Sequence, residues 1–314
     1  MTKNVLITTS SFQLNGNEYL TRLRQADFEV ILNPYKRRLS EEEINGLLRE
    51  HEPVGMIAGV EPLTAAVIGS AKSLKVISRC GVGTDSVDLE AAEASGIPVT
   101  ITPGGPTAAV SELTLSLMLA ACRRVVEADR NVRSGEWGAL MGRLLARQVV
   151  GLIGFGRIGQ AVAGLCQAFG ATVIASDPIA SSSGDVLIQD VESVLSQADI
   201  VSLHVPLTDE TRGLLNAERI ASMKPGSILI NAARGDLVDE AALHDALKSG
   251  HLAAAALDCF VDEPYEGPLR GCPTAILTAH MGSYAREARA LMEQEAAQNL
   301  VEQLEALSLL DMPG

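Results

Sequence analysis

The stretch Val149–Gly159, VVGLIGFGRIG, decides the fold. An apolar run typical of a buried strand leads into three glycines, Gly154, Gly156 and Gly159, at the spacing G-x-G-x-x-G. The first glycine permits a tight turn, the second lets the backbone approach a pyrophosphate, and the third lets the next helix lie close to the strand. The pattern predicts a strand, a phosphate-binding turn and a helix whose N-terminus faces the phosphates.

An acidic residue completes this unit. After the predicted helix Gln160–Phe169, a second apolar run, Ala171–Ser176, ends at Asp177, 18 positions beyond Gly159. A carboxylate there accepts hydrogen bonds from the adenosine ribose and repels a 2′-phosphate, and no Arg or Lys follows in Pro178–Gly184. We therefore expect NAD rather than NADP; the alternative is a turn that needs its glycines for packing alone.

Composition narrows the function classes. The chain has 314 residues, 47% of them hydrophobic, which is enough for two domains. A net charge of −14 disfavours nucleic acids and anionic membranes as partners. The five cysteines show no C-x-x-C pair and no metal-ligand spacing, so we expect no bound metal. Their odd number and scattered positions indicate a protein of the reducing cytoplasm. We find no signal peptide and no apolar run of transmembrane length.

Strand and helix patterns alternate along the whole chain, which predicts an α/β fold of two Rossmann-like βαβ domains with doubly wound parallel sheets. Pro103–Pro106, PGGP, is the strongest break and predicts a hinge. The final helix, Glu287–Leu307, carries an apolar stripe suited to packing back on the first domain. The expected domains are therefore residues 1–102 plus 285–314, and residues 103–284, with a ligand cleft between them.

The helix predicted at Ser111–Asn131 is unusually apolar. Its run Leu113–Ala121 is too dense for a surface helix and favours burial against a neighbouring element or a second subunit. A homodimer is the expected assembly.

Three polar residues follow predicted strands downstream of the glycine turn. Arg234 lies in NAARG, Glu263 in DCFVDEP and His280 in LTAHMGS. Ligands collect at the carboxyl ends of parallel strands, so these side chains are candidates for the chemistry that accompanies hydride transfer. Taken alone, a residue of each of these types is more often a surface or structural residue. The prediction of a site rests on all three residues together.

These blocks resemble the D-isomer-specific 2-hydroxyacid dehydrogenase family, and within it the phosphoglycerate dehydrogenase-like branch. The resemblance spans Val54–Ser283 and rests on several motifs. Besides the fingerprint and the three blocks above, they are GVEPLT from Gly59, SRCGVG from Ser78, HVPLT from His204 and MKPG from Met223.

The resemblance implies a hydride transfer between NAD and C2 of a 2-hydroxy or 2-oxo acid, with D-isomer specificity and 3-phosphoglycerate as a possible substrate. Arg234 then binds the substrate carboxylate, His280 is the acid–base group, and Glu263 orients the imidazole.

The resemblance also implies the ligand contacts. The substrate-binding residues it implies are Arg79, Val82, Gly83, Arg234 and His280. The cofactor-binding residues are Gly154, Gly156, Arg157, Ile158, Gly159, Asp177, His204, Pro206, Thr211, Ala232, Asp258, His280 and Ser283.

Some residues depart from the family pattern. Pro106 and Ser86 stand where Asn is usual, and Gly59 lies where a phosphate-binding Arg is often found. Arg79 remains as one cation for an anionic tail, which leaves non-phosphorylated acids open. The alternatives are a glyoxylate or hydroxypyruvate reductase, a formate dehydrogenase-like enzyme, which Glu263 disfavours, and a non-catalytic NAD-sensing scaffold of the corepressor type.

Overall fold

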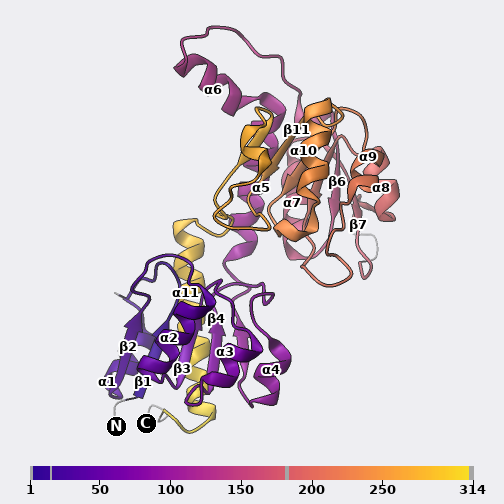
Figure 1. Cartoon of the computed structure of the whole chain (residues 1–314). Helices are drawn as coiled ribbons and strands as arrows, with labels where there is room; N and C mark the ends of the chain where they lie inside the picture. The colour runs from indigo at the N-terminus through magenta and orange to yellow at the C-terminus, as the bar shows by residue number, and fades with distance from the viewer. Residues whose placement is uncertain (1–2, 15, 181–183, 311–314) are drawn as a thin grey trace. The chain divides into compact units, whose positions relative to one another are not determined.

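The computed structural model describes residues 3–14, 16–180 and 184–310. The chain divides into two compact units, Met1–Pro106 with Ala285–Gly314, and Thr107–Tyr284 (Figure 1). Each unit contains one sheet in which every paired strand is parallel, with helices between the strands. The α/β fold class is confirmed.

The first unit is built on a five-stranded sheet in the order β2-β1-β3-β4-β5. Its strands are β1 (Lys3–Ile7), β2 (Phe28–Leu32), β3 (Gly55–Ala58), β4 (Val76–Arg79) and β5 (Val99–Ile101). Its helices are α1 (Glu18–Gln25), α2 (Glu41–His51), α3 (Ala65–Ser70), α4 (Leu89–Ala94) and α11 (Arg286–Ala306). Polar caps fix the starts of the first four helices; at α2, Ser40 and Glu43 form a capping box.

Helix α11 completes the core of this first unit, although it comes from the other end of the chain. Met292, Leu300 and Leu304 are buried in one cluster with Val5 and Ile57 of the sheet. The helix also accepts a hydrogen bond of 2.8 Å from the Ser78 hydroxyl at the Ala296 carbonyl. Leu291 and Leu307, which the apolar stripe places in the core, are instead 48% and 42% exposed, because they lie outside the buried face.

The second unit holds a seven-stranded sheet in the order β12-β11-β10-β9-β6-β7-β8. Its strands are β6 (Val149–Ile153), β7 (Thr172–Ser176), β8 (Leu187–Ile188), β9 (Ile200–Leu203), β10 (Ile228–Asn231), β11 (Ala254–Leu257) and β12 (Ala275–Leu277). Its helices include α7 (Arg157–Ala168), α8 (Val191–Gln197), α9 (Ala217–Ser222) and α10 (Glu240–Ser249), with short 3₁₀ turns η1 (Leu145–Arg147), η2 (Gly235–Leu237) and η3 (Pro268–Gly271). Chain order reverses between β6 and β9, and such a switch point is where open α/β sheets bind ligands.

One helix prediction needs correction. The single helix expected at Ser111–Asn131 is two, α5 (Pro106–Arg123) and α6 (Val125–Arg133), because Arg124 between them has a left-handed backbone with φ of 53°. Before α9, Thr208 and Thr211 form a turn in which each hydroxyl accepts from the backbone N–H of the other residue; Asn216 is the N-cap of α9.

Part of the apolar run in α5 is explained by its own sheet. Leu117, Met118 and Ala121 are buried in one cluster with Val150 and Leu152 of β6. Among the described residues, no helix is both long enough and apolar enough to cross a membrane.

Candidate active site

Most of the side chains expected to bind ligands in the second unit follow the ends of its parallel strands and therefore line one edge of the sheet. In strand order from β12 to β7, the segments that follow the strands contain His280, Asp258, Arg234, His204, Gly154 and Asp177.

The glycine turn after β6 is tight. Gly154 has a φ of +98°, and a Cβ there would lie 2.6 Å from the carbonyl of His204. A Cβ at Gly159 would lie 2.3 Å from the carbonyl oxygen of Gly154, so a side chain at either position forces the backbone apart.

Gly156 has a different reason to be small. It is the N-cap of α7, makes no side-chain capping bond, and a Cβ there would meet nothing within 4 Å. Arg157 and Ile158 form the first turn of the helix behind it. The backbone at Gly156 thus borders open space at the positive end of a 12-residue helix, which fits a pyrophosphate.

Asp177 is held at the end of β7 by three backbone N–H groups. Its carboxylate accepts from Phe155 at 2.8 Å and from Ile179 and Ala180 at 2.9 Å. Burial favours the neutral acid, but these hydrogen bonds outweigh it and lower the pKa of Asp177. The residue is therefore a fixed anion beside the glycine turn. Its Oδ1 accepts from both Ile179 and Ala180 and its Oδ2 from Phe155 alone, so Oδ2 keeps a lone pair for a ribose hydroxyl.

The segment after β9 lies against the same turn. Burial lowers the pKa of His204 to about 4, so its imidazole is neutral, and its Nε2 lies 3.0 Å from the Ser202 hydroxyl. Pro206 and Thr211 belong to one turn, in which the Thr211 hydroxyl donates to the Pro206 carbonyl at 2.7 Å. Neither His204 nor this turn lies in a helix or strand.

Asp258 fixes the turn that carries His280. It is 1% exposed, and its carboxylate accepts from the Thr278 hydroxyl at 2.6 Å and from the backbone N–H groups of Met281 and Gly282 at 2.9 and 2.7 Å. The His280 N–H donates to the Asp258 carbonyl at 2.8 Å. His280 itself has a φ of +50°, a backbone conformation that needs such support and recurs at functional sites.

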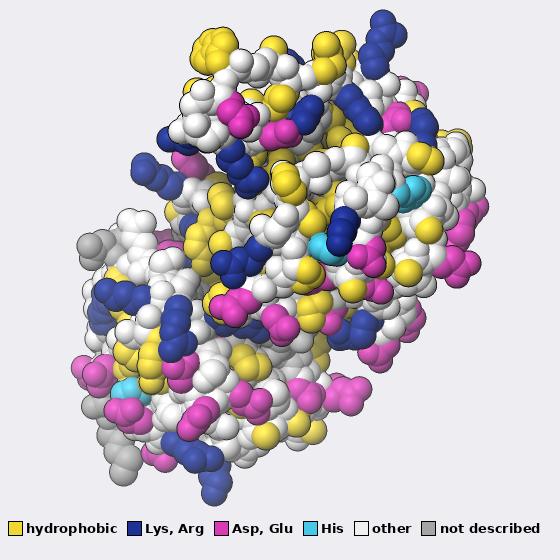
Figure 2. All heavy atoms as spheres, turned by 45° about the horizontal axis from the view of Figure 1, so that its top comes forward, with side chains coloured by type: hydrophobic (Ala, Val, Ile, Leu, Met, Phe, Trp, Pro, Cys, Tyr) yellow, Lys and Arg dark blue, Asp and Glu magenta, His cyan; other side chains and the backbone are white. Residues whose placement is uncertain are grey.

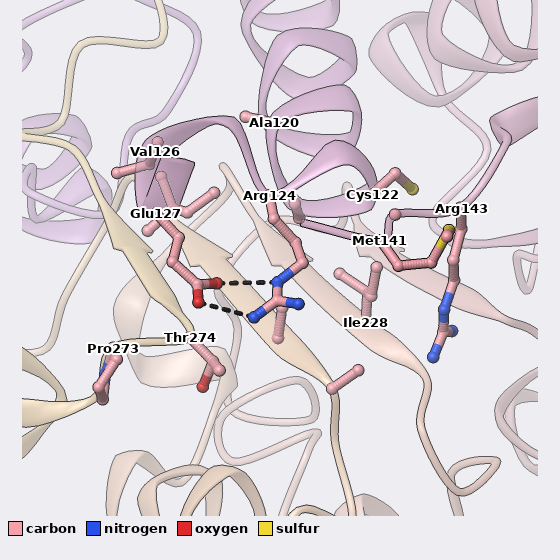
Figure 3. A pocket seen from close by; sticks show the side chains of 15 residues that line it. Ala120, Cys122, Arg124, Val126, Glu127, Met141, Arg143, Ile228, Pro273 and Thr274 are labelled. Atoms are coloured by element: carbon pink, nitrogen blue, oxygen red, sulfur yellow. Dashed lines mark hydrogen bonds and ion pairs between the residues drawn. The ribbon is translucent and has the colours of Figure 1, made fainter. Parts of the chain in front are cut away.

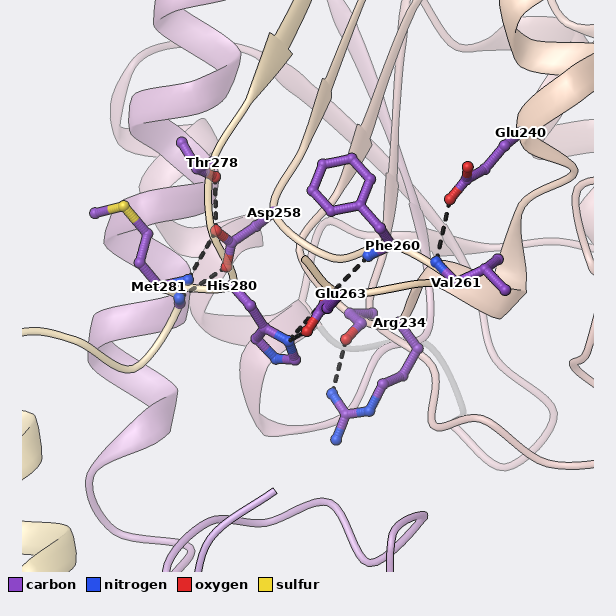
Figure 4. Close-up of polar contacts among 11 residues, drawn as sticks. Arg234, Glu240, Asp258, Phe260, Val261, Glu263, Thr278, His280 and Met281 are labelled. Atoms are coloured by element: carbon purple, nitrogen blue, oxygen red, sulfur yellow. Dashed lines mark hydrogen bonds and ion pairs between the residues drawn. The ribbon is translucent and has the colours of Figure 1, made fainter. Parts of the chain in front are cut away.

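The imidazole of His280 lies against the carboxylate of Glu263 (Figure 4). Its Nδ1 is 3.0 and 2.9 Å from the two carboxylate oxygens, and Glu263 also accepts from the Phe260 N–H at 3.1 Å. This contact occupies Nδ1 and leaves Nε2 as the ring nitrogen that can exchange a proton with a ligand.

Arg234 reaches the same place from β10. The neighbouring Gly235 packs against the backbone of Phe260, and a Cβ at Gly235 would lie 2.0 Å from the Phe260 carbonyl carbon. The absence of a side chain at Gly235 therefore lets the segments after β10 and β11 lie together. The Arg234 backbone carbonyl accepts from Asn231 at 2.8 Å, and its guanidinium donates to the Ala233 carbonyl at 2.7 Å. Figure 4 shows the guanidinium beside Glu263 and His280. Ala232 is buried on the same segment, and Ser283 is half-buried three positions after His280.

Cys259 is a member of this cluster that sequence reasoning missed. It is 2% exposed, and its sulfur, a Glu263 oxygen and a His280 nitrogen all lie within 4.8 Å of one another. No signal in the spacing of the cysteines indicates this, because the histidine comes from another strand end.

The expected substrate residues of the first unit lie at the carboxyl end of β4. Val82 is 43% exposed and Gly83 half-buried, whereas Arg79 is 5% exposed. The Arg79 guanidinium donates to the Cys80 carbonyl at 2.5 Å, and a Cβ at Gly81 would lie 2.7 Å from it. Arg79 therefore packs against the backbone of the loop that carries Val82 and Gly83 and holds it in place.

Glu61, also missed from sequence, is a buried carboxyl near Arg79. It is 1% exposed, bonds to the Thr8 hydroxyl, and accepts from the Gly59 N–H at 3.0 Å. Burial raises the pKa of Glu61, although the Arg79 charge opposes the rise.

A cavity of about 280 Å³ lies at the opposite edge of the second sheet, where β10, β11 and β12 begin (Figure 3). Its charged groups are already engaged: Arg124 bonds to Glu127 at 2.8 and 2.6 Å, and Arg143 donates to the Gly226 carbonyl. The chemistry-bearing residues of the second unit lie at the carboxyl edge instead.

Residues 115–282 match the sequence profile of the D-isomer specific 2-hydroxyacid dehydrogenase, NAD binding domain. The chain belongs to this family. The resemblance stated from the motifs is thereby confirmed, and the matched segment contains the glycine turn, Asp177, Arg234, Glu263 and His280.

Known proteins agree with this placement. The chain is 38% identical over 300 residues to a D-3-phosphoglycerate dehydrogenase of Archaeoglobus fulgidus, covering 93% of this chain and 56% of the relative. It is 37% identical over 274 residues to a hydroxypyruvate reductase of Thermotoga maritima, covering 85% of this chain and 89% of that protein. A solved structure from Thermus thermophilus has a TM-score of 0.87 at 42% identity, covering 96% of this chain and 97% of that one. The chain spans about half the length of the phosphoglycerate dehydrogenases it matches.

Proposed function

We propose that the protein is an NAD-dependent dehydrogenase that transfers a hydride between nicotinamide and C2 of a 2-hydroxy or 2-oxo acid, with the D-isomer as the hydroxy acid. The observation that carries this proposal is the Glu263–His280 pair, with Nδ1 2.9 and 3.0 Å from the carboxylate oxygens, on the same sheet edge as the glycine turn. Bound NAD supplies or accepts the hydride.

The chain's own residues manage the proton and the substrate charge. We propose that His280 gives a proton from Nε2 to the C2 oxygen during reduction and takes it back during oxidation. Glu263 holds the ring in place through Nδ1. Arg234 binds the substrate carboxylate, because its planar guanidinium matches a carboxylate with two hydrogen bonds.

The cofactor choice rests on Asp177. A fixed carboxylate with a lowered pKa, held by three backbone N–H groups, favours the two ribose hydroxyls of NAD and repels the 2′-phosphate of NADP. Asp258 is the proposed partner of the nicotinamide amide, in addition to its support of the His280 turn.

We assign the two binding tasks to separate parts of the chain. Residues 103–284 are proposed to bind NAD, and residues 1–102 with 285–314 to supply substrate contacts. The backbone of Val82 and Gly83 holds the substrate carboxylate in this proposal.

The identity of the substrate depends on which residues contact the part of the acid beyond C2, its tail. A D-3-phosphoglycerate dehydrogenase needs a cation for the phosphate, and Arg79 is the residue we nominate from sequence. Its burial at 5% exposure favours a second candidate, a glyoxylate or hydroxypyruvate reductase, in which the tail carries no charge. The similarity to the Thermotoga maritima hydroxypyruvate reductase, 89% of which is covered, supports this candidate.

One experiment tests the proposal. The purified chain is assayed with NADH and a panel of 2-oxo acids that includes phosphohydroxypyruvate, hydroxypyruvate, glyoxylate and pyruvate. We expect loss of NADH absorbance with at least one of them. No turnover with any acid, in either direction and with either cofactor, would reject the dehydrogenase.

We further propose that the protein is a cytoplasmic homodimer. None of the five cysteines, all of which are described, forms a disulfide, as expected in a reducing compartment. Between α6 and η1, Trp137, Met141 and Leu144 are 92%, 88% and 63% exposed, and Figure 2 shows hydrophobic side chains at the surface of this part. Exposed apolar side chains of this size in one short segment suit the contact between two copies of the chain.

A further inference from the structure

We propose that Cys259, Glu263 and His280 form a zinc site, and that Zn²⁺ bound there inhibits the acid–base histidine. The three side chains come from the segments after β11 and β12, and each offers one ligand atom within 4.8 Å of the other two. Cys259 has no part in the proposed dehydrogenase mechanism. Its thiol beside the Glu263–His280 pair is therefore available for metal binding.

The ligand set selects the metal. Zinc is bound in proteins by thiolate, imidazole and carboxylate at about 2.0–2.3 Å, so a tetrahedral ion separates its ligand atoms by roughly 3.5 Å. Small side-chain rotations bring atoms that already lie within 4.8 Å of one another to that separation. Magnesium and calcium prefer oxygen ligands and do not suit a site with sulfur and nitrogen.

The site is buried at its base, at Cys259, and reaches solvent at His280 and Glu263. Cys259 is 2% exposed and directly follows Asp258, whose backbone N–H donates to the Asn231 carbonyl at 2.8 Å. The side chains of His280 and Glu263 are 36% and 19% exposed. An ion can therefore enter past the imidazole and carboxylate and meet the sulfur at the bottom.

Metal binding displaces protons in a defined way. Zn²⁺ takes the place of the proton between Nδ1 of His280 and Glu263, and the Cys259 thiol loses its proton to become a thiolate ligand. A ring with zinc on Nδ1 and hydrogen on Nε2 has no nitrogen left to accept a proton. Inhibition of turnover thus rests on the proposed function, whereas binding of the ion does not.

The test measures binding and inhibition separately. Zinc chloride is titrated into the chelator-treated full chain by calorimetry, in two buffers with different ionisation enthalpies, and Co²⁺ is added in place of zinc for absorption spectra. Cys259→Ser and Cys259→Val remove the sulfur, Cys272→Ser is the matched control outside the cluster, and Mg²⁺ is the control ion.

We expect one zinc ion per chain with proton release, and a thiolate-to-cobalt absorption band in the native protein. Both Cys259 variants should weaken zinc binding and zinc inhibition at least tenfold while the Cys272 variant matches the native protein. Absence of the cobalt band, or unchanged zinc affinity in Cys259→Ser, overturns the site. A chain that binds zinc through Cys259 but reduces no 2-oxo acid keeps the site and rejects the proposed dehydrogenase.

Discussion

Glu263 presents both carboxylate oxygens to one nitrogen of His280, at 3.0 and 2.9 Å from Nδ1. His280→Ala should lower kcat by about 10²–10⁴-fold, the range for loss of general acid–base catalysis, with NADH affinity nearly unchanged. Glu263→Gln should have a smaller effect, because the ring remains but its orientation is no longer fixed by a charge. Steady-state kinetics with NADH titration measures both, and exposed Glu266→Gln is the control. Undiminished kcat in His280→Ala would remove the residue from the mechanism.

Asp177→Asn tests the cofactor choice. The amide keeps the size of the carboxylate but loses its charge, so we expect NADH to bind about tenfold more weakly and NADPH to be rejected less. Because Asp177 also holds three backbone N–H groups, thermal unfolding of the variant is measured alongside the two cofactor affinities. Asp190→Asn, a helix N-cap elsewhere in the unit, is the control. An unaltered NADH-to-NADPH preference would show that Asp177 does not face the ribose.

Arg79→Ala distinguishes two roles for this residue, a contact with the substrate's anionic tail and support of the loop after β4. The guanidinium lies beneath Gly81 and donates to Cys80, so its loss disturbs the loop that carries Val82 and Gly83. If support is the main role, kcat/KM falls by similar factors for phosphohydroxypyruvate and glyoxylate. A loss at least tenfold larger for the phosphorylated acid would instead identify Arg79 as a contact of the anionic tail, the role that the sequence leaves open for it.

His204 predicts a pH dependence of stability. Its folded pKa of about 4 lies below the ordinary value of 6.5, so the unfolded chain binds the extra proton first. The stability that His204 contributes is therefore complete above pH 6.5 and is lost as the pH falls toward 4, by up to about 3 kcal/mol. Urea unfolding at several pH values should show a shallower decline for His204→Gln than for the native chain. An identical decline in both would show that His204 is not the group responsible; His244→Gln is the control.

The exposed segment after α6 predicts the assembly. Light scattering after gel filtration should give twice the chain mass of 33.0 kDa for the native protein. Trp137→Ser combined with Met141→Ser should give the mass of one chain, because two large apolar contacts are removed. Ile179→Ser, at a side chain that is also 92% exposed, should stay dimeric. A monomeric native protein would end the proposal.

The sequence predicts the second sheet well, because its pattern is local. Glycine spacing, apolar runs and the acid at Asp177 each depend on neighbours within one βαβ unit. The Glu263–His280 pair follows from the rule that carboxyl ends of parallel strands share an edge, together with the family resemblance.

The predictions from sequence fail or are incomplete where contacts between distant parts of the chain determine the structure. Nothing in the residue types around Arg124 marks the end of α5, since neither glycine nor proline is present there. Cys259 and His280 lie on different strand ends, and no pairwise spacing in the chain connects them. Glu61 reads as part of a loop, but its burial beside Thr8 depends on the sheet that surrounds it.

Helix α11 has a consequence for the order of synthesis. The ribosome finishes residues 107–284 before it makes the segment that covers Val5 and Ile57. Until Met292, Leu300 and Leu304 emerge, one apolar face of the first sheet is covered only in part, by Leu20 and Leu23 of α1, even though its strands were translated first. The chain therefore completes the core of its middle unit before that of its first unit, and apolar side chains of the early strands stay partly exposed during that interval.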